Sequence, residues 1–155
     1  PRSTRKESSA ASDVYKRQAQ NRTRGARPFG AVLTMDGEIV STGVNDIVHS
    51  HDPTSHAEME AIRTASRALA RPNMQGAVIY ASGHPCPMCL AAMVLTGVDA
   101  AYYAFDNKDA APYGLSSEAV YQKLQLPLVP PPLPLTRLDI GWTAAQLYDN
   151  SSDTK

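Results

Sequence analysis

The stretches His56-Ala57-Glu58 and Pro85-Cys86-Pro87-Met88-Cys89 decide how this sequence is interpreted. They offer one imidazole and two thiolates, which suit zinc, and three protein ligands leave the fourth tetrahedral position of zinc open for water. Zinc with such an open position lowers the pKa of the water. Glu58 is not needed as a ligand and follows the histidine by two residues, so it can hold and transfer a proton. The pattern predicts Zn²⁺ on His56, Cys86 and Cys89, with Glu58 as the catalytic carboxylate of an enzyme.

Each half of this pattern is ambiguous alone. H-x-E triplets arise by chance on helices, and C-x-x-C also occurs in structural zinc sites and redox dithiols. Cys86 and Cys89 are the only cysteines, so one chain cannot form a four-cysteine site, and small secreted disulfide domains carry several cysteine pairs. A redox dithiol remains an alternative, although it gives no role to His56-Ala57-Glu58. The two halves together favour a catalytic zinc site.

Residues 1–18 show no apolar periodicity, and we expect them to be disordered. The run from Ser8 to Gln18 resembles the translation of a sequencing adapter. This indicates a metagenomic fragment in which the natural start of the protein, with its N-terminal helix, has been replaced by a non-native tail. A native polar tail is the alternative. Residues 19–155 have a size typical of a single domain with one core.

The charge of the chain is balanced, with 15 Lys and Arg against 15 Asp and Glu. This argues against non-specific nucleic-acid binding, which depends on clustered positive charge, but does not exclude it. Arg22, Arg24 and Arg27 form the one basic cluster of the expected domain, and we interpret it as a solvated face. No apolar stretch approaches the length of a membrane span. We expect a cytoplasmic enzyme, because catalytic thiolates favour a reducing compartment.

Strand-like and helix-like patterns alternate along the chain, which predicts an α/β fold. Asp36-Gly37 between two β-rich runs predicts a hairpin. Ser55-x-x-Glu58 indicates a capping box at one helix start, and Pro87 suits the first position of the next helix. The metal ligands would then meet at two helix N-termini, whose positive ends stabilise thiolates. The expected strands are 29–35, 38–44, 76–82, 100–105 and 135–140, and the expected helices are 54–70, 87–96, 116–124 and 142–148.

The sequence from Pro28 to Tyr121 resembles the guanine deaminases of the cytidine-deaminase fold. H-x-E followed by P-C-x-x-C is also the general signature of zinc deaminases. The resemblance implies a three-layer α/β/α fold around a central mixed five-stranded sheet, with zinc as the cofactor. The matching segments are Pro28-Phe29-Gly30-Ala31-Val32, Asp52 to Glu58, Pro85 to Leu90, and the loop Asp109-Ala110-Ala111 with Gly114.

The same resemblance implies roles for residues around the metal. Phe29 would pack against the substrate ring, although an ordinary strand core residue is the alternative. Asn45 would hydrogen-bond the base, although a turn residue is the alternative. The backbone N–H of Ala57 would address a ring carbonyl.

Three positions depart from the guanine deaminases, and we expect them to contact the substrate. Ser116-Ser117 and His84 each stand where that branch has an acidic residue, and Leu95 stands where it has tryptophan. A carboxylate is the natural partner for the amidine-like edge of guanine, and Ser117 cannot replace that charge. We therefore expect a deaminase of a free nucleobase with an altered pocket, acting on isocytosine, cytosine or a related aminopyrimidine or purine.

A polynucleotide deaminase acting on tRNA adenosine or single-stranded DNA cytosine is the alternative function, and it would flip its base into the same pocket. A non-catalytic, zinc-stabilised binding protein is an alternative of another class. The resemblance further implies a homodimer in which the C-terminal segment crosses to the neighbouring subunit. The proline-dense segment 126–134 would be the hinge of this exchange, and Trp142 and Tyr148 would close the pocket of the partner.

Overall fold

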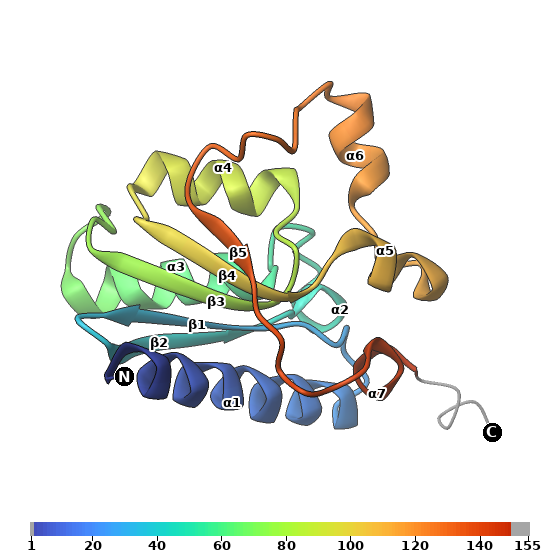
Figure 1. The fold of residues 1–155 in the computed structure, drawn as a ribbon, viewed down its shortest axis with the longest axis horizontal. Helices are drawn as coiled ribbons and strands as arrows, with labels where there is room; N and C mark the ends of the chain where they lie inside the picture. The colour runs from blue at the N-terminus through green and yellow to red at the C-terminus, as the bar shows by residue number, and fades with distance from the viewer. Residues whose placement is uncertain (1, 150–155) are drawn as a thin grey trace.

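The computed structural model describes residues 2–149 of the 155-residue chain, so residue 1 of the expected tail and residues 150–155 of the expected domain lie outside it. A five-stranded sheet forms the centre of the described part, in the order β2-β1-β3-β4-β5 (Figure 1). This confirms the predicted central sheet. The strands are β1 (Gly30–Met35), β2 (Glu38–Val44), β3 (Ala77–Gly83), β4 (Ala100–Phe105) and β5 (Leu135–Arg137).

The sheet is mixed, as predicted. β1 pairs antiparallel with both β2 and β3, whereas β4 runs parallel to β3 and to β5. The predicted hairpin joins β1 to β2 through Asp36 and Gly37, whose φ angles are 50° and 75°. Two positive φ angles in a two-residue turn match the right-handed twist of the paired strands.

Helices cover both faces of the sheet, which confirms the three-layer α/β/α architecture. Helix α1 (Arg2–Thr23) lies on one face, and α3 (Ala57–Leu69) and α4 (Pro87–Thr96) lie on the other (Figure 1). Alternate residues of a strand face opposite sides of a sheet. Accordingly Val32 of β1 packs with the α1 layer, while Leu33 belongs to the larger core beneath α3 and α4.

The expectation that residues 1–18 are disordered is wrong for the residues that the structure describes. They belong to α1, in which Ala10, Val14, Gln18 and Asn21 are all buried. Their spacing of three or four residues places them on one helical face. Burial against the sheet supplies the stability that a polar helix lacks alone. A helix thus occupies the N-terminal position, whereas the non-native origin of these residues, and with it the loss of the natural helix, stays a prediction.

The predicted helix starts agree with the structure within three residues, but one cap differs. The N-cap of α3 is His56, and no side chain caps the helix, so Ser55-x-x-Glu58 is not a capping box. The Ser55 hydroxyl donates instead to Glu60 Oε1, at 3.1 Å. The N-cap of α4 is Cys86, and Pro87 opens that helix as predicted. Metal-ligand candidates thus occupy both N-cap positions, where capping residues would otherwise stand.

The C-terminal part is shorter in regular structure than predicted. The strand expected at 135–140 ends at Arg137, and the helix expected at 142–148 begins at Ala144. β5 pairs with β4 of its own chain, so the structure of one chain does not contain the predicted segment exchange.

No helix among residues 2–149 is long and apolar enough to cross a membrane. The other short elements are α2 (Ile47–Ser50), α5 (Asn107–Ala110), a 3₁₀ turn (Ala111–Tyr113), α6 (Glu118–Lys123) and α7 (Ala144–Tyr148).

Candidate metal centre and pocket

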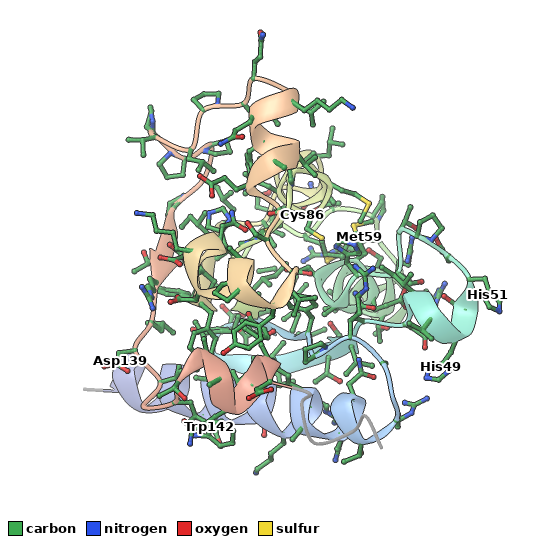
Figure 2. All side chains as sticks on the ribbon, turned by 90° about the vertical axis from the view of Figure 1, so that its right-hand side faces the viewer. His49, His51, Met59, Cys86, Asp139 and Trp142 are labelled. Atoms are coloured by element: carbon green, nitrogen blue, oxygen red, sulfur yellow. The ribbon has the colours of Figure 1, made fainter. Side chains whose placement is uncertain are left out.

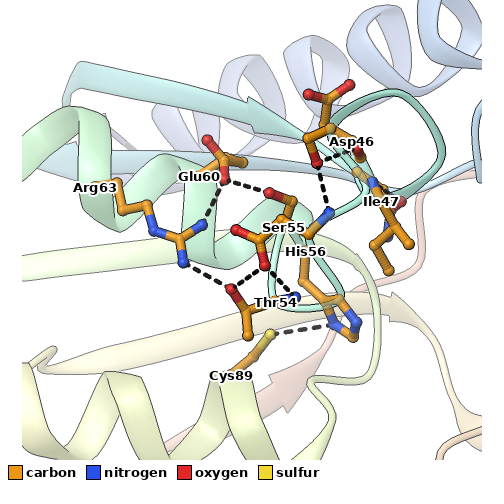
Figure 3. Close-up of polar contacts among 11 residues, drawn as sticks. Asp46, Ile47, Thr54, Ser55, His56, Glu60, Arg63 and Cys89 are labelled. Carbon is orange, nitrogen blue, oxygen red and sulfur yellow. Dashed lines mark hydrogen bonds and ion pairs between the residues drawn. The ribbon is translucent and has the colours of Figure 1, made fainter.

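The three predicted metal ligands meet where α3 and α4 begin. Cys86 Sγ lies 3.5 Å from His56 Nδ1, and Cys89 Sγ lies 3.6 Å from the same nitrogen (Figure 3). All three ligand atoms lie within 4.8 Å of one another. The two helix N-termini add partial positive charge beside the sulfurs, which favours their thiolate form.

This donor set fits zinc. Zinc bonds of about 2.3 Å to sulfur and about 2.0–2.1 Å to nitrogen, in tetrahedral geometry, place the sulfur and nitrogen ligand atoms roughly 3.5–3.6 Å apart. The two observed sulfur-to-nitrogen distances, 3.5 and 3.6 Å, agree with that separation. His56, Cys86 and Cys89 can therefore hold zinc with little rearrangement.

The loop that presents His56 is held by a polar network. Asp52 Oδ1 accepts the Thr54 N–H and hydroxyl at 2.8 and 2.7 Å. Arg63 donates to Glu60 at 2.6 Å and to Thr54 Oγ1 at 2.9 Å (Figure 3). These bonds tie the loop to the second turn of α3, so the imidazole is fixed before a metal binds.

The cysteines differ in protonation when no metal is present. The hydrogen bond from the Cys89 thiol lowers the pKa of Cys86 to about 4, and the bond to His56 adds to this effect. The pKa of Cys89 is raised, because its thiol donates a hydrogen bond to the Cys86 sulfur and because the thiol is buried. Zinc binds thiolates, so loading the site must displace the Cys89 proton.

Glu58 lies beside this cluster and is 8% exposed. Burial raises its pKa to about 7, and its Oε2 accepts a hydrogen bond from Cys89 Sγ at 3.5 Å. A carboxyl group with a pKa near neutrality can both accept and release a proton at working pH. The predicted proton shuttle is therefore in contact with the metal ligands and free of any arginine or lysine partner within the described residues.

A cavity of about 300 Å³ opens onto the cluster and is lined by both His56 and Glu58. Five of the six other predicted contacts line it too. They are Phe29, Asn45, Ala57, His84 and Ser117. The cavity is at the small end of the range for ligand-binding pockets, and it is lined by apolar walls with few polar groups.

Asn45 and His84 each directly follow the last residue of a strand, β2 and β3, and both line this cavity. Asn45 is buried, and its Oδ1 accepts the Ile47 N–H at 3.3 Å. His84 contacts Pro85 O through Nδ1 at 2.9 Å and lies edge-on to the rings of Tyr103 and Tyr121. Burial lowers the pKa of His84, so the ring is held as a neutral group.

Ser117 is fixed by a neighbouring loop. Its N–H and its hydroxyl both donate to Asn107 Oδ1, at 2.9 and 3.2 Å. Asn107 opens α5, which a capping box between Asp106 and Asp109 stabilises, and Arg137 of β5 pairs with both of these aspartates. The last strand of the sheet thus supports the wall of the cavity.

Leu95, for which we predicted a contact with the substrate, lies away from the cavity of its own chain, and that contact stays a prediction. Leu95 is 86% exposed and does not line the cavity. It follows Cys89 by six residues of α4, which places it about 9 Å further along the helix and about 240° around it. The position therefore faces solvent in a single chain.

Trp142 and Tyr148, which we predicted to close the pocket of a partner subunit, do not line the cavity of their own chain, and the contact with a partner stays a prediction. Tyr148 is buried against Phe29, Phe105 and Tyr113 of its own chain, and its hydroxyl has no partner among the described residues. Trp142 is 43% exposed, and Figure 2 shows it beside α7, well apart from Cys86.

Several cavity residues were not predicted. Leu115, Val120 and Met88 form apolar parts of the cavity wall. They lie close in sequence to Ser116-Ser117 or to the cysteines, and this closeness could have indicated their position at the cavity. Arg27 also lines the cavity, although its basic cluster was interpreted as a solvated face. Its position two residues before Phe29 was the signal for it.

Known proteins show the same combination of fold and site. Over residues 4–105 the chain matches the family model of the cytidine and deoxycytidylate deaminase zinc-binding region. It is 40% identical over 100 residues to the guanine deaminase of Bacillus subtilis (strain 168), a match that covers 64% of each sequence. It is 38% identical over 86 residues to a tRNA-specific adenosine deaminase of Aquifex aeolicus, covering 55% of this chain and 57% of that protein.

These sequence matches span less than two thirds of the length of the two relatives. The similarity in structure extends further. The crystal structure of guanine deaminase from Bacillus subtilis superposes with a TM-score of 0.73 at 28% identity, and covers 95% of this chain and 94% of that one. The chain therefore belongs to the cytidine and deoxycytidylate deaminase family, whose members share this zinc-binding region.

Proposed function

We propose that this protein is a zinc-dependent hydrolase that deaminates a free nucleobase or a similarly small amino-substituted heterocycle. The observation that carries the proposal is the position of Glu58, a buried carboxyl group that contacts the metal-ligand candidate Cys89 and lines a small cavity. The reaction consumes water and converts a ring C–NH₂ group into a carbonyl, with release of ammonia.

His56, Cys86 and Cys89 would hold the zinc ion. When bound there, zinc supplies a Lewis acid that makes water nucleophilic at neutral pH. Glu58 takes one proton from the water and delivers it to the ring nitrogen beside the reacting carbon. It then takes the second proton from the hydroxyl group now on that carbon and gives it to the departing amine, which leaves a carbonyl group and ammonia.

Binding of the ring falls to residues of the cavity. Phe29 offers a flat apolar surface, Asn45 offers a buried amide, and the first N–H of α3, on Ala57, is one of the groups that an α-helix leaves without an internal partner. Apart from Glu58 no carboxylate lines the cavity among the described residues. This disfavours guanine and favours isocytosine, cytosine or a related aminopyrimidine.

A polynucleotide deaminase is the second candidate, because tRNA-specific adenosine deaminases are among the relatives. Such an enzyme needs a track of positive charge for the backbone outside its base pocket. Arg27 is the one lysine or arginine that lines the cavity among residues 2–149. The charge distribution therefore favours a small substrate.

A substrate panel separates these candidates. Zinc-loaded protein would be tested for ammonia release from guanine, isoguanine, isocytosine, cytosine, adenine, their nucleosides and a single-stranded oligonucleotide, with Glu58→Ala as the blank. Turnover of free bases that disappears in the blank supports the proposal. Turnover of the oligonucleotide alone would assign the protein to the polynucleotide class, and full zinc occupancy without any turnover would indicate a binding protein.

We also propose that the protein is a homodimer in the cytoplasm, where its thiolates stay reduced. Several apolar side chains remain exposed on α4 and just after α6, including Leu95 and Leu124 at 86% and 57%. A monomeric native mass at micromolar concentration would contradict the dimer.

A further inference from the structure

Arg27 is a cation at the cavity that nothing in the described chain neutralises. It lines the same cavity as His56 and Glu58, and its guanidinium forms no hydrogen bond or ion pair with the side chains that the structure describes. Half-buried Arg63 pairs with Glu60, and Arg137 pairs with Asp106 and Asp109, but neither of these arginines lines the cavity. An unpaired guanidinium at a pocket presents five donors in a planar fork that matches carboxylate and phosphate.

The backbone of Arg27 is fixed, so its side chain starts from a defined place. The carbonyl of Arg27 accepts the Asn21 side-chain N–H and the Phe29 N–H, both at 2.8 Å. The next residue is Pro28, which is buried and locks one backbone angle. This segment leads directly into β1, so the guanidinium is anchored to the rigid sheet.

The rest of the cavity wall supplies no anion that could be its partner. Glu58 is the one acidic residue of the lining among the described residues, and the metal cluster beside it is itself rich in negative charge. Ser116 and Ser117, which also line the cavity, offer only neutral hydroxyl groups. The site is therefore polarised, with negative groups at the metal and positive charge at Arg27.

We propose that Arg27 binds an anionic group of the substrate, so that the preferred substrate is an amino-substituted N-heterocycle that carries a carboxylate or a phosphate. This rests on the proposed deaminase function and narrows its substrate class. In this arrangement the reacting amine faces Glu58 and the metal ligands, and the anionic group of the same molecule contacts Arg27. One such cation suffices for a small anion, whereas a polynucleotide needs several along its backbone.

Matched pairs of substrates test this with the zinc-loaded protein. Cytosine is compared with its ring carboxylate, and cytidine with cytidine monophosphate, so the two arms separate a carboxylate source from a phosphate source. The wild type should prefer the anionic member of at least one pair by about 10- to 100-fold in kcat/KM, the range expected of charge-assisted hydrogen bonds. The preference should arise mainly in KM and shrink as ionic strength rises.

Three variants assign the effect. Arg27→Gln should remove the preference for the anion, and Arg27→Lys should retain part of it. Arg24→Gln is the matched control, since Arg24 is exposed and does not line the cavity. Equal rates for neutral and anionic substrates in the wild type, or a preference that survives Arg27→Gln, would overturn the inference while the deaminase function stands.

Binding provides a readout that does not depend on turnover. In Glu58→Gln protein, the affinity for the uracil carboxylate product should fall about 10-fold or more when Arg27→Gln is added. No such fall would overturn the inference even if no substrate is turned over, in which case the proposed function fails separately. Preference for an oligonucleotide over the matched mononucleotide would also overturn it.

Discussion

The position of α3 depends on a glycine in the neighbouring strand, and this gives the sharpest structural prediction. A Cβ atom added at Gly43 of β2 would lie 2.1 Å from the carbonyl oxygen of Ala57 and 2.7 Å from the nitrogen of Ala61. Both are backbone atoms of α3, so no side chain can move aside to relieve the contact. Close approach of the helix to the strand therefore requires glycine at this place.

Gly43→Ala should displace the start of α3 by about 1.4 Å, since the first of these contacts must lengthen from 2.1 Å to about 3.5 Å. Ala57 lies between the metal ligand His56 and the proton shuttle Glu58, so both would move with it. Overpacking of this kind costs about 1–3 kcal/mol of unfolding free energy. A displacement of about 1 Å at a catalytic group can reduce the rate about 100-fold.

Urea unfolding, zinc content and ammonia release measure the three effects. Thr42→Ala is the matched control, because Thr42 is the adjacent residue on the opposite face of the same strand, and it should lose less than about 1 kcal/mol. Wild-type stability together with full zinc content in Gly43→Ala would refute the argument that this glycine positions the site.

Three further variants test the chemistry and its support. Glu58→Gln should keep zinc and lose turnover. In metal-free wild-type protein, burial raises the pKa of Glu58 from 4.5 to about 7, so the fold favours the protonated form and should lose about 3 kcal/mol of unfolding free energy as the pH rises from 4.5 to above 7. Glu58→Gln should remove this pH-dependent loss. Tyr121→Phe removes the hydrogen bond of 2.6 Å to Pro85 O, just before the first cysteine ligand, and should cost about 1 kcal/mol and speed zinc release to a chelator. Asn107→Ala frees the backbone and hydroxyl of Ser117, and should raise KM several-fold with a smaller change in kcat.

Each of these outcomes has a clear contrary result. The Glu58 argument fails if the metal-free wild type and Glu58→Gln show the same pH dependence of unfolding free energy between pH 4.5 and 8. Unchanged zinc release in Tyr121→Phe would show that the Pro85 carbonyl does not position the ligand loop. A fall in kcat at constant KM in Asn107→Ala would indicate that Ser117 acts in the chemical step rather than in binding.

The features that could be predicted from sequence are those with a local cause. Asp36-Gly37 specifies a tight hairpin through its own backbone preferences, and the hairpin is present. The metal ligands are also predictable, because His56, Cys86 and Cys89 sit at the first turns of two helices, where short sequence spacing fixes their direction.

Features that depend on tertiary context were not predictable. The stripe of Ala10 and Val14 in α1 is small and interrupted by polar residues, and only the sheet beneath it makes the helix stable. Leu95 lies on a helix that contributes to the site, but the side it faces depends on where α4 packs. Arg27 lies at the cavity because of the path that the chain takes into β1. No local sequence pattern indicates this path.

Ammonia release from free bases, compared between wild-type protein and Glu58→Ala at equal zinc content, tests the central claim most directly. The account predicts about one zinc per chain in both proteins, steady ammonia release from at least one free aminopyrimidine by the wild type, and none above background by the variant. Equal rates in the two proteins, or ammonia release that persists after zinc is removed by a chelator, would contradict it.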